Sequence, residues 1–173
     1  MEFVPIYSVP LWQSQYREFE GNKDSITEAI ERIKTHNLDK LDQYFINVNI
    51  GFITSFVIQS CYHCAADINL SADSFFISNL SFYEKSVDIK STEKQNLFTA
   101  VLWLESDEES YITVNNVIPE WRGCDFVKHK NQYTSTEIKV VPEKGDFFIF
   151  PSYLDFSLTH NKSSCFVFDI NLV

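Results

Sequence analysis

The tetrapeptide Cys61-Tyr62-His63-Cys64 is the densest group of potential metal ligands and nucleophiles in this sequence. A zinc site would need a second pair of ligands, and a redox site would need a thioredoxin-like context. The sequence provides neither. On a helix Cys61 and Cys64 share a face, so we interpret them as small, buried hydrophobic residues.

A second possible metal site combines Asp155, His160 and Glu93. Strand geometry argues against it, because residues 155 and 160 project from opposite faces of a strand unless a turn intervenes. The Asn-Lys-Ser-Ser sequence at 161–164 is typical of a loop and favours a solvated His160.

Trp121 and Arg122 lie in a long loop, and both residue types are enriched at interface hot spots. A loop folded around its own tryptophan would explain them equally well. Both residues are therefore candidates for contact with a partner. No Ser-His-Asp pattern, phosphate-binding glycine loop or calcium loop is present in the sequence.

The composition indicates a β-rich chain of 173 residues, long enough for one domain with a substantial core. Aromatic residues, which favour strands, make up 16%. The net charge of 14 − 24 = −10 disfavours contact with nucleic acid or an anionic membrane and suits a basic protein partner. Since neither a disulfide pattern, a secretory signal nor a membrane-length apolar stretch is present, we expect an intracellular location.

Residues 1–70 are expected to form an N-terminal strand and helices. The expected elements are an edge strand within 3–12, helices over 22–36 and 54–69, and either a helix or an alternating strand within 38–53. Ser25 and Glu28 have the spacing of a capping box at the start of the first helix.

Residues 71–173 are expected to form the β core. Eight strands are predicted, over 74–83, 86–89, 97–104, 110–114, 136–141, 146–150, 156–159 and 165–172. Pro151 is expected to end the pairing of the sixth, because proline has no N–H to donate. Helices followed by strands indicate an α+β fold that is mainly β.

Residues 142–156 resemble the C-terminal half of the 2-oxoglutarate- and iron(II)-dependent oxygenases, above all a branch found in tailed bacteriophage genomes. That branch shows a Pro-x-x-Gly-Asp turn, an apolar strand and then Phe-Pro-Ser-Trp-Leu-x-His. The matching residues are Pro142, Gly145, Asp146, Phe150, Pro151, Ser152, Tyr153, Leu154, Asp155 and Phe156. The resemblance implies a double-stranded β-helix, or jelly-roll, with the N-terminal helices packed on one sheet.

The same resemblance implies two histidines and a carboxylate for iron(II), and an arginine that binds the far carboxylate of 2-oxoglutarate. No histidine here begins a His-x-Asp, His-x-Glu or His-x-His motif. The corresponding metal positions hold Ser91, Glu93 and Phe156, and the arginine position holds Cys165. We therefore expect no metal and no cofactor, since one carboxylate cannot hold iron(II) alone.

These observations predict a non-catalytic structural or interaction protein on an oxygenase-like jelly-roll, in the context of a tailed-phage neck, tail or baseplate. Its expected partners are proteins, either other virion subunits or copies of itself, in the host cytoplasm or the virion. Two alternatives stay open. One is an active 2-oxoglutarate dioxygenase with a relocated metal site, and the other is a small acidic protein that binds a host factor.

Overall fold

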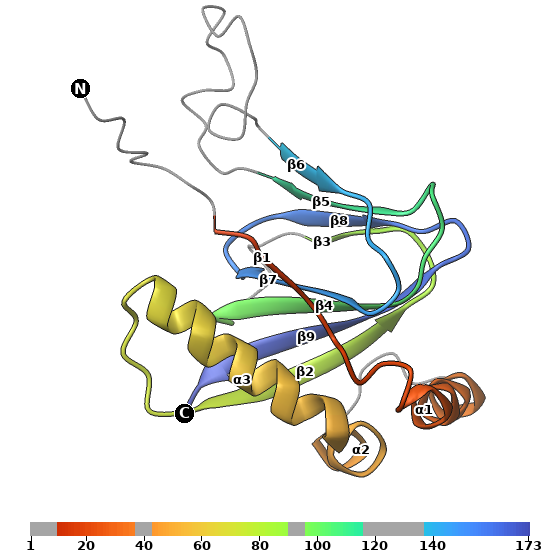
Figure 1. Ribbon diagram of the computed structural model, residues 1–173, viewed down its shortest axis with the longest axis horizontal. Coiled ribbons are helices and arrows are strands. Elements are labelled where there is room, and N and C mark those ends of the chain that lie inside the picture. The colour runs from red at the N-terminus through yellow and green to blue at the C-terminus, as the bar shows by residue number, and fades with distance from the viewer. Residues whose placement is uncertain (1–9, 37–42, 90–95, 116–136) are drawn as a thin grey trace, which may run out of the picture.

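A computed structural model describes residues 10–36, 43–89, 96–115 and 137–173. They form two facing β-sheets with helices on one side (Figure 1). In chain order the elements are β1 (Trp12–Gln15), α1 (Lys23–His36), α2 (Gln43–Asn49), α3 (Gly51–Asp67), β2 (Phe75–Tyr83), β3 (Val87–Ile89), β4 (Phe98–Glu105), β5 (Tyr111–Asn115), β6 (Glu137–Val140), β7 (Asp146–Pro151), β8 (Phe156–Thr159) and β9 (Ser164–Leu172). The predicted α+β, mainly β fold class is confirmed.

One sheet has the strand order β1-β7-β4-β9-β2 and the other β3-β8-β5-β6, with antiparallel pairing throughout the described residues. All eight strands predicted after residue 73 are present, with ends within one residue of those expected. Pro151 still pairs with Phe98, so β7 ends one residue later than predicted. The edge strand begins at Trp12, whereas most of the predicted range of 3–12, namely residues 3–9, lies outside the described residues.

The helices pack on the outer face of the five-stranded sheet, as predicted (Figure 1). The strand alternative for 38–53 is wrong where that segment is described. Ile46, Ile50 and Ile53 are buried at a spacing of four and three residues, which is a helical stripe that continues from α2 into α3. None of these described helices is both long and apolar enough to cross a membrane.

Helix α1 begins before the predicted capping box. The Ile26 N–H donates to the Asn22 carbonyl at 2.9 Å, so Asn22 precedes the first turn and Ser25 lies within it. The Asn22 side chain donates to the Tyr16 hydroxyl at 2.8 Å. The capping-box prediction is therefore wrong. The residue that precedes the first turn is Asn22, which is held by its hydrogen bond to Tyr16 after β1.

Strand β7 separates two apolar layers. Phe147 and Ile149 face the helices, while Phe148 and Phe150 face the four-stranded sheet. All six residues of β7 are buried. The strand therefore has a continuous apolar sequence instead of an alternating one, as expected for a strand covered on both faces.

The turn before β7 depends on Gly145, which has a φ of +85°. Its N–H donates to the Trp103 carbonyl at 2.8 Å, and its own carbonyl accepts the Tyr16 N–H at 2.9 Å. These bonds hold the Gly145 peptide between the end of β1 and β4, in a backbone conformation that residues other than glycine rarely adopt.

Gly145→Ala is expected to lower the free energy of unfolding by about 1–3 kcal/mol, because alanine is strained at positive φ. Urea denaturation measures the change. The matched control is Gly51→Ala at the start of α3, where an added Cβ meets no atom within 4 Å and should be neutral or stabilising. Equal stabilities of the two variants would contradict this account of the turn.

Candidate functional site

The space between the two sheets is the interior in which a jelly-roll could hold a ligand. Among the described residues, this space holds a cluster of buried, mainly aromatic and aliphatic side chains. They are Val101, Trp103, Ile112, Val114, Phe148, Phe150, Leu154, Phe156, Leu158, Cys165 and Val167. This inter-sheet core packs the two sheets together.

Two of the positions singled out in the sequence lie inside the inter-sheet core. Phe156, the first residue of β8, is buried and packs edge-on against Phe150 with ring centroids 4.9 Å apart. Cys165 on β9 pairs with Trp103 and is fully buried, and this burial raises the pKa of its thiol well above the usual value. Phe156 has no lone pair for a metal, and the neutral Cys165 cannot bind a carboxylate as an arginine would.

A small polar group continues the inner face of the five-stranded sheet beyond this core. Thr99 pairs with Phe150 and with Asp169, so all three project to the interior side. The Thr99 hydroxyl lies 2.9 Å from that of Ser152, and Asn79 Nδ2 donates to Asp169 Oδ2 at 3.1 Å. The one carboxylate of this polar group is thus already hydrogen-bonded within the sheet.

Asp155 and His160 lie at opposite ends of β8. Five residues of strand at about 3.3 Å each separate them by about 16 Å. The structure therefore does not bring them together as the relocated metal site requires. Ser91, Glu93, Trp121 and Arg122 all lie outside the described residues.

His160 is half-buried, and the prediction of a solvated histidine is wrong. Its ring stacks on the Trp103 indole, with centroids 5.1 Å apart and 14° between the planes. Its Nδ1 lies 2.7 Å from the Ser163 hydroxyl and its Nε2 lies 3.7 Å from Cys165 Sγ. Sequence reasoning missed this cluster. The three-residue spacing of His160 and Ser163 across a turn was its local signal.

Cys61 and Cys64 lie on the buried face of α3, as predicted. Burial is the main cause that raises the pKa of each thiol to about 12, assisted by the neighbouring Cys64 for Cys61 and by Asp67 for Cys64. Both thiols are therefore protonated at neutral pH and unsuited to nucleophilic or metal chemistry.

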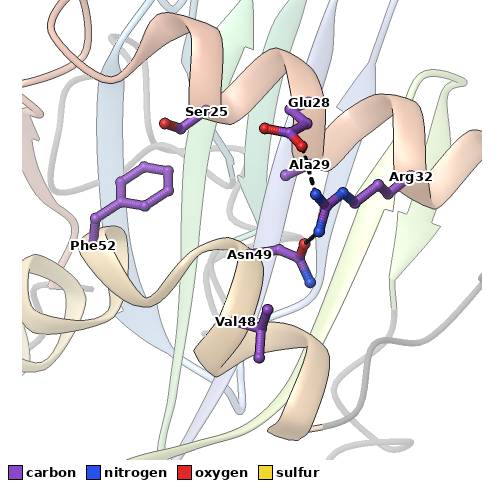
Figure 2. A pocket seen from close by; sticks show the side chains of 7 residues that line it. All are labelled: Ser25, Glu28, Ala29, Arg32, Val48, Asn49 and Phe52. Atoms are coloured by element: carbon purple, nitrogen blue, oxygen red, sulfur yellow. Dashed lines mark hydrogen bonds and ion pairs between the residues drawn. The ribbon is translucent and has the colours of Figure 1, made fainter.

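A surface pocket of about 170 Å³ lies between α1 and the α2–α3 junction (Figure 2). It is lined by Ser25, Glu28, Ala29, Arg32, Val48, Asn49 and Phe52. The Arg32 guanidinium donates to Asn49 Oδ1 at 2.6 Å and pairs with Glu28. Arg32 thus joins two helices on the outside of the sheet, and it does not reach the inter-sheet core.

No protein-family model matches the chain, and no curated protein matches it. Solved structures do. A prolyl-4-hydroxylase from Pseudomonas putida superimposes with a TM-score of 0.61 at 11% identity, over 95% of this chain and 87% of the hydroxylase. The non-heme α-ketoglutarate-dependent carbocyclase SnoK from nogalamycin biosynthesis superimposes with a TM-score of 0.50 at 9% identity, over 95% and 81% of the two chains.

This chain has the jelly-roll fold of those oxygenases. The predicted double-stranded β-helix is therefore confirmed. Sequence identities this low establish a shared fold and not a shared function.

The resemblance noted in the sequence implies an iron(II) centre, and the described residues do not fit one. Among them, no three His, Cys, Asp or Glu side chains lie close enough together to hold a metal ion. Among the described residues, the inner face offers the Asp169 carboxylate, which is bonded to Asn79, the Cys165 thiol beside the His160 ring, and otherwise hydroxyl, amide and apolar groups. Iron(II) in such folds needs two imidazoles as well.

Proposed function

We propose that this protein is non-catalytic and acts by binding another protein through the surface of an oxygenase-type jelly-roll. The observation that carries the proposal is the apolar inter-sheet core of the described residues, in which Phe156, which has no lone pair for a metal, and Cys165, which cannot bind a carboxylate as an arginine would, are both buried. Such a cluster of apolar side chains is what a folding core requires, and no metal-binding group of His, Cys, Asp and Glu side chains is found among the described residues.

The proposed partner is a protein with a basic face. The net charge of −10 favours such a partner and disfavours nucleic acid. Trp121 and Arg122 are the proposed contact residues, on the strength of their residue types.

As a finer proposal, the resemblance to a phage-associated branch suggests a virion or assembly component. Mass spectrometry of particles purified from the encoding genome tests it, and absence from the particles would overturn that version.

The competing function is an active 2-oxoglutarate- and iron(II)-dependent dioxygenase. It is favoured by the two fold neighbours, which are named as a hydroxylase and as an α-ketoglutarate-dependent carbocyclase. In this chain it would need a ligand set completed by residues such as Glu93. That set would have to form beside the buried aromatic side chains of the inter-sheet core.

Anaerobic addition of iron(II) and 2-oxoglutarate distinguishes the two functions. We expect no rise in the midpoint of thermal unfolding and no succinate on admitting oxygen, because a ligand stabilises a protein only by binding its folded state. A catalytically active oxygenase of the same fold, assayed in parallel, controls for the reagents. A clear rise in the midpoint or stoichiometric succinate would replace the proposed function by the dioxygenase.

A further inference from the structure

Strand β1 forms one edge of the five-stranded sheet, and among the described residues no strand pairs with its outer side (Figure 1). The Tyr16 N–H donates to the Gly145 carbonyl at 2.9 Å, so the backbone groups of Tyr16 face β7. Successive residues of a strand direct their N–H and C=O groups to opposite sides, so those of Gln13 and Gln15 point away from β7. These two exposed residues therefore offer two donors and two acceptors to an added strand.

A surface pocket of about 200 Å³ lies beside this edge, between β1 and α3. The side chains that face one another across it are small, namely Ser14 on β1 and Ser60 and Cys64 on α3. Ser14 pairs with Phe147 and therefore projects toward the helices, as Phe147 does. The buried rings and chains of Phe147 and Ile149 give the pocket an apolar lining. This space is smaller than the roughly 300–1,000 Å³ of small-molecule sites and suits a single apolar side chain.

The pocket has a negative group at the end where α3 finishes. Trp12 lines the pocket, and its indole Nε1 donates to Asp67 Oδ2 at 3.0 Å. Asp67 is the last residue of α3, so its charge adds to the partial negative charge of the helix C-terminus. Among the described residues no lysine or arginine forms an ion pair with Asp67. This exposed carboxylate is therefore available to a cation of a partner.

We propose that an extended segment of a partner protein adds to the outer edge of β1 as an antiparallel strand and inserts an apolar side chain into the pocket between β1 and α3. This inference rests on the proposed protein-binding function and names the chemistry of the partner. Antiparallel pairing matches the described strands of this sheet and is the more stable mode per residue. In strand addition the backbone bonds supply affinity, and pockets for alternate side chains supply specificity.

The register of β1 determines the spacing of side chains in the partner. In an antiparallel pair the residue opposite Ser14 projects to the same side as Ser14, with the two Cβ atoms about 4.5–5.5 Å apart, and so enters the pocket. The residue two positions later lies opposite Trp12, where a lysine or arginine side chain can extend to Asp67. The segment is therefore an apolar residue, any residue and then a basic residue. A basic partner also suits the net charge of −10, which opposes the approach of a second copy.

An NMR titration of the full chain with a blocked heptapeptide, Thr-Thr-Leu-Thr-Lys-Thr-Thr, tests the proposal. At up to about 2 mM peptide, the amide signals of Gln13 and Gln15 should shift and their hydrogen exchange should slow, because both N–H groups gain acceptors. A peptide with alanine in place of leucine should bind about tenfold more weakly or worse, because it leaves the pocket empty. Unchanged signals of Gln13 and Gln15 at this concentration would overturn the proposal.

Two phenylalanine variants test the pocket itself. Ser14→Phe fills the pocket from β1 and should weaken binding of the heptapeptide about tenfold or more. The matched control, Gln15→Phe, places the same ring on the opposite face of the strand and should bind as the wild type does. Both positions are exposed, so both variants should fold. Equal affinities of the two variants would refute insertion into the pocket.

Asp67→Asn tests the basic position of the partner. The variant keeps an oxygen acceptor for Trp12 but removes the charge, so binding should weaken about two- to fivefold, as for an exposed ion pair. The loss should disappear for a peptide with norleucine in place of lysine. A loss of the same size with norleucine would refute the pairing with Asp67.

The same samples distinguish two other occupants of the edge. A dimer in sedimentation equilibrium that Ser14→Phe dissociates would place a second copy on β1 and overturn the proposal. Acetyl-leucine methylamide binding as tightly as the heptapeptide would make this a pocket for small apolar molecules and would also overturn it. Either failure leaves the proposed function standing, because the addition of iron(II) and 2-oxoglutarate tests that function without involving β1.

Discussion

Replacing Phe156 by alanine is expected to lower the free energy of unfolding by about 3–5 kcal/mol, which is the cost of removing a fully buried phenylalanine. The ring is buried between the sheets and packs against Phe150. Little relaxation can fill the resulting cavity, because the strands on either side are held by β-sheet hydrogen bonds. Urea denaturation followed by circular dichroism measures the loss.

The control is Tyr153→Ala in the neighbouring β7–β8 turn, where the side chain is 60% exposed. Its effect should stay within about 0.5 kcal/mol. If Phe156→Ala cost no more than this control, Phe156 would not be a core residue. The main support for a non-catalytic function would then fail.

Phe147→Ala, in the apolar layer between the five-stranded sheet and the helices, is expected to lower the free energy of unfolding by a similar amount, about 3–5 kcal/mol. Phe147 is buried between β7 and α3, and its ring lies 4.8 Å from that of Phe56. The Phe56 ring in turn packs against the Tyr16 ring, with the ring centroids 4.9 Å apart. The loss should therefore weaken the docking of α3 as well as the sheet, which exchange protection in α3 would report alongside the unfolding free energy.

Phe76→Ala serves as the comparison for Phe147→Ala, since Phe76 on β2 is 41% exposed. A phenylalanine that keeps much of its water contact should cost well under half as much. Similar losses for the two variants would mean that α3 is not held by the Phe147 layer.

The positions and the ends of the eight strands after residue 73 could be predicted because most of them are local runs of β-branched and aromatic residues between turn residues. The run Phe147–Phe150 is an example, bounded by Gly145 and Pro151. The range of α1 was predicted to within one residue, but its capping was not. Ser25 fitted a capping box on paper, yet it lies inside the first turn, and Asn22 before it bonds to Tyr16.

The segment before α3 shows the same limit. Its alternating pattern was compatible with a strand, but burial of Ile46, Ile50 and Ile53 against the five-stranded sheet requires a helix. Periodicity over a few residues supports both interpretations. The sheet that the segment covers, which is built mostly from later residues, decides between them.

The sequence by itself determined that no histidine begins a paired metal-ligand motif. Its resemblance to the oxygenases predicts that Phe156 and Cys165 occupy the positions of a metal ligand and of the carboxylate-binding arginine. Only the tertiary structure decided that both side chains are buried in the inter-sheet core and that His160 stacks on Trp103. The groups around His160 come from β4, β9 and two turns, so their contacts depend on how the sheets pack and not on spacing along the chain.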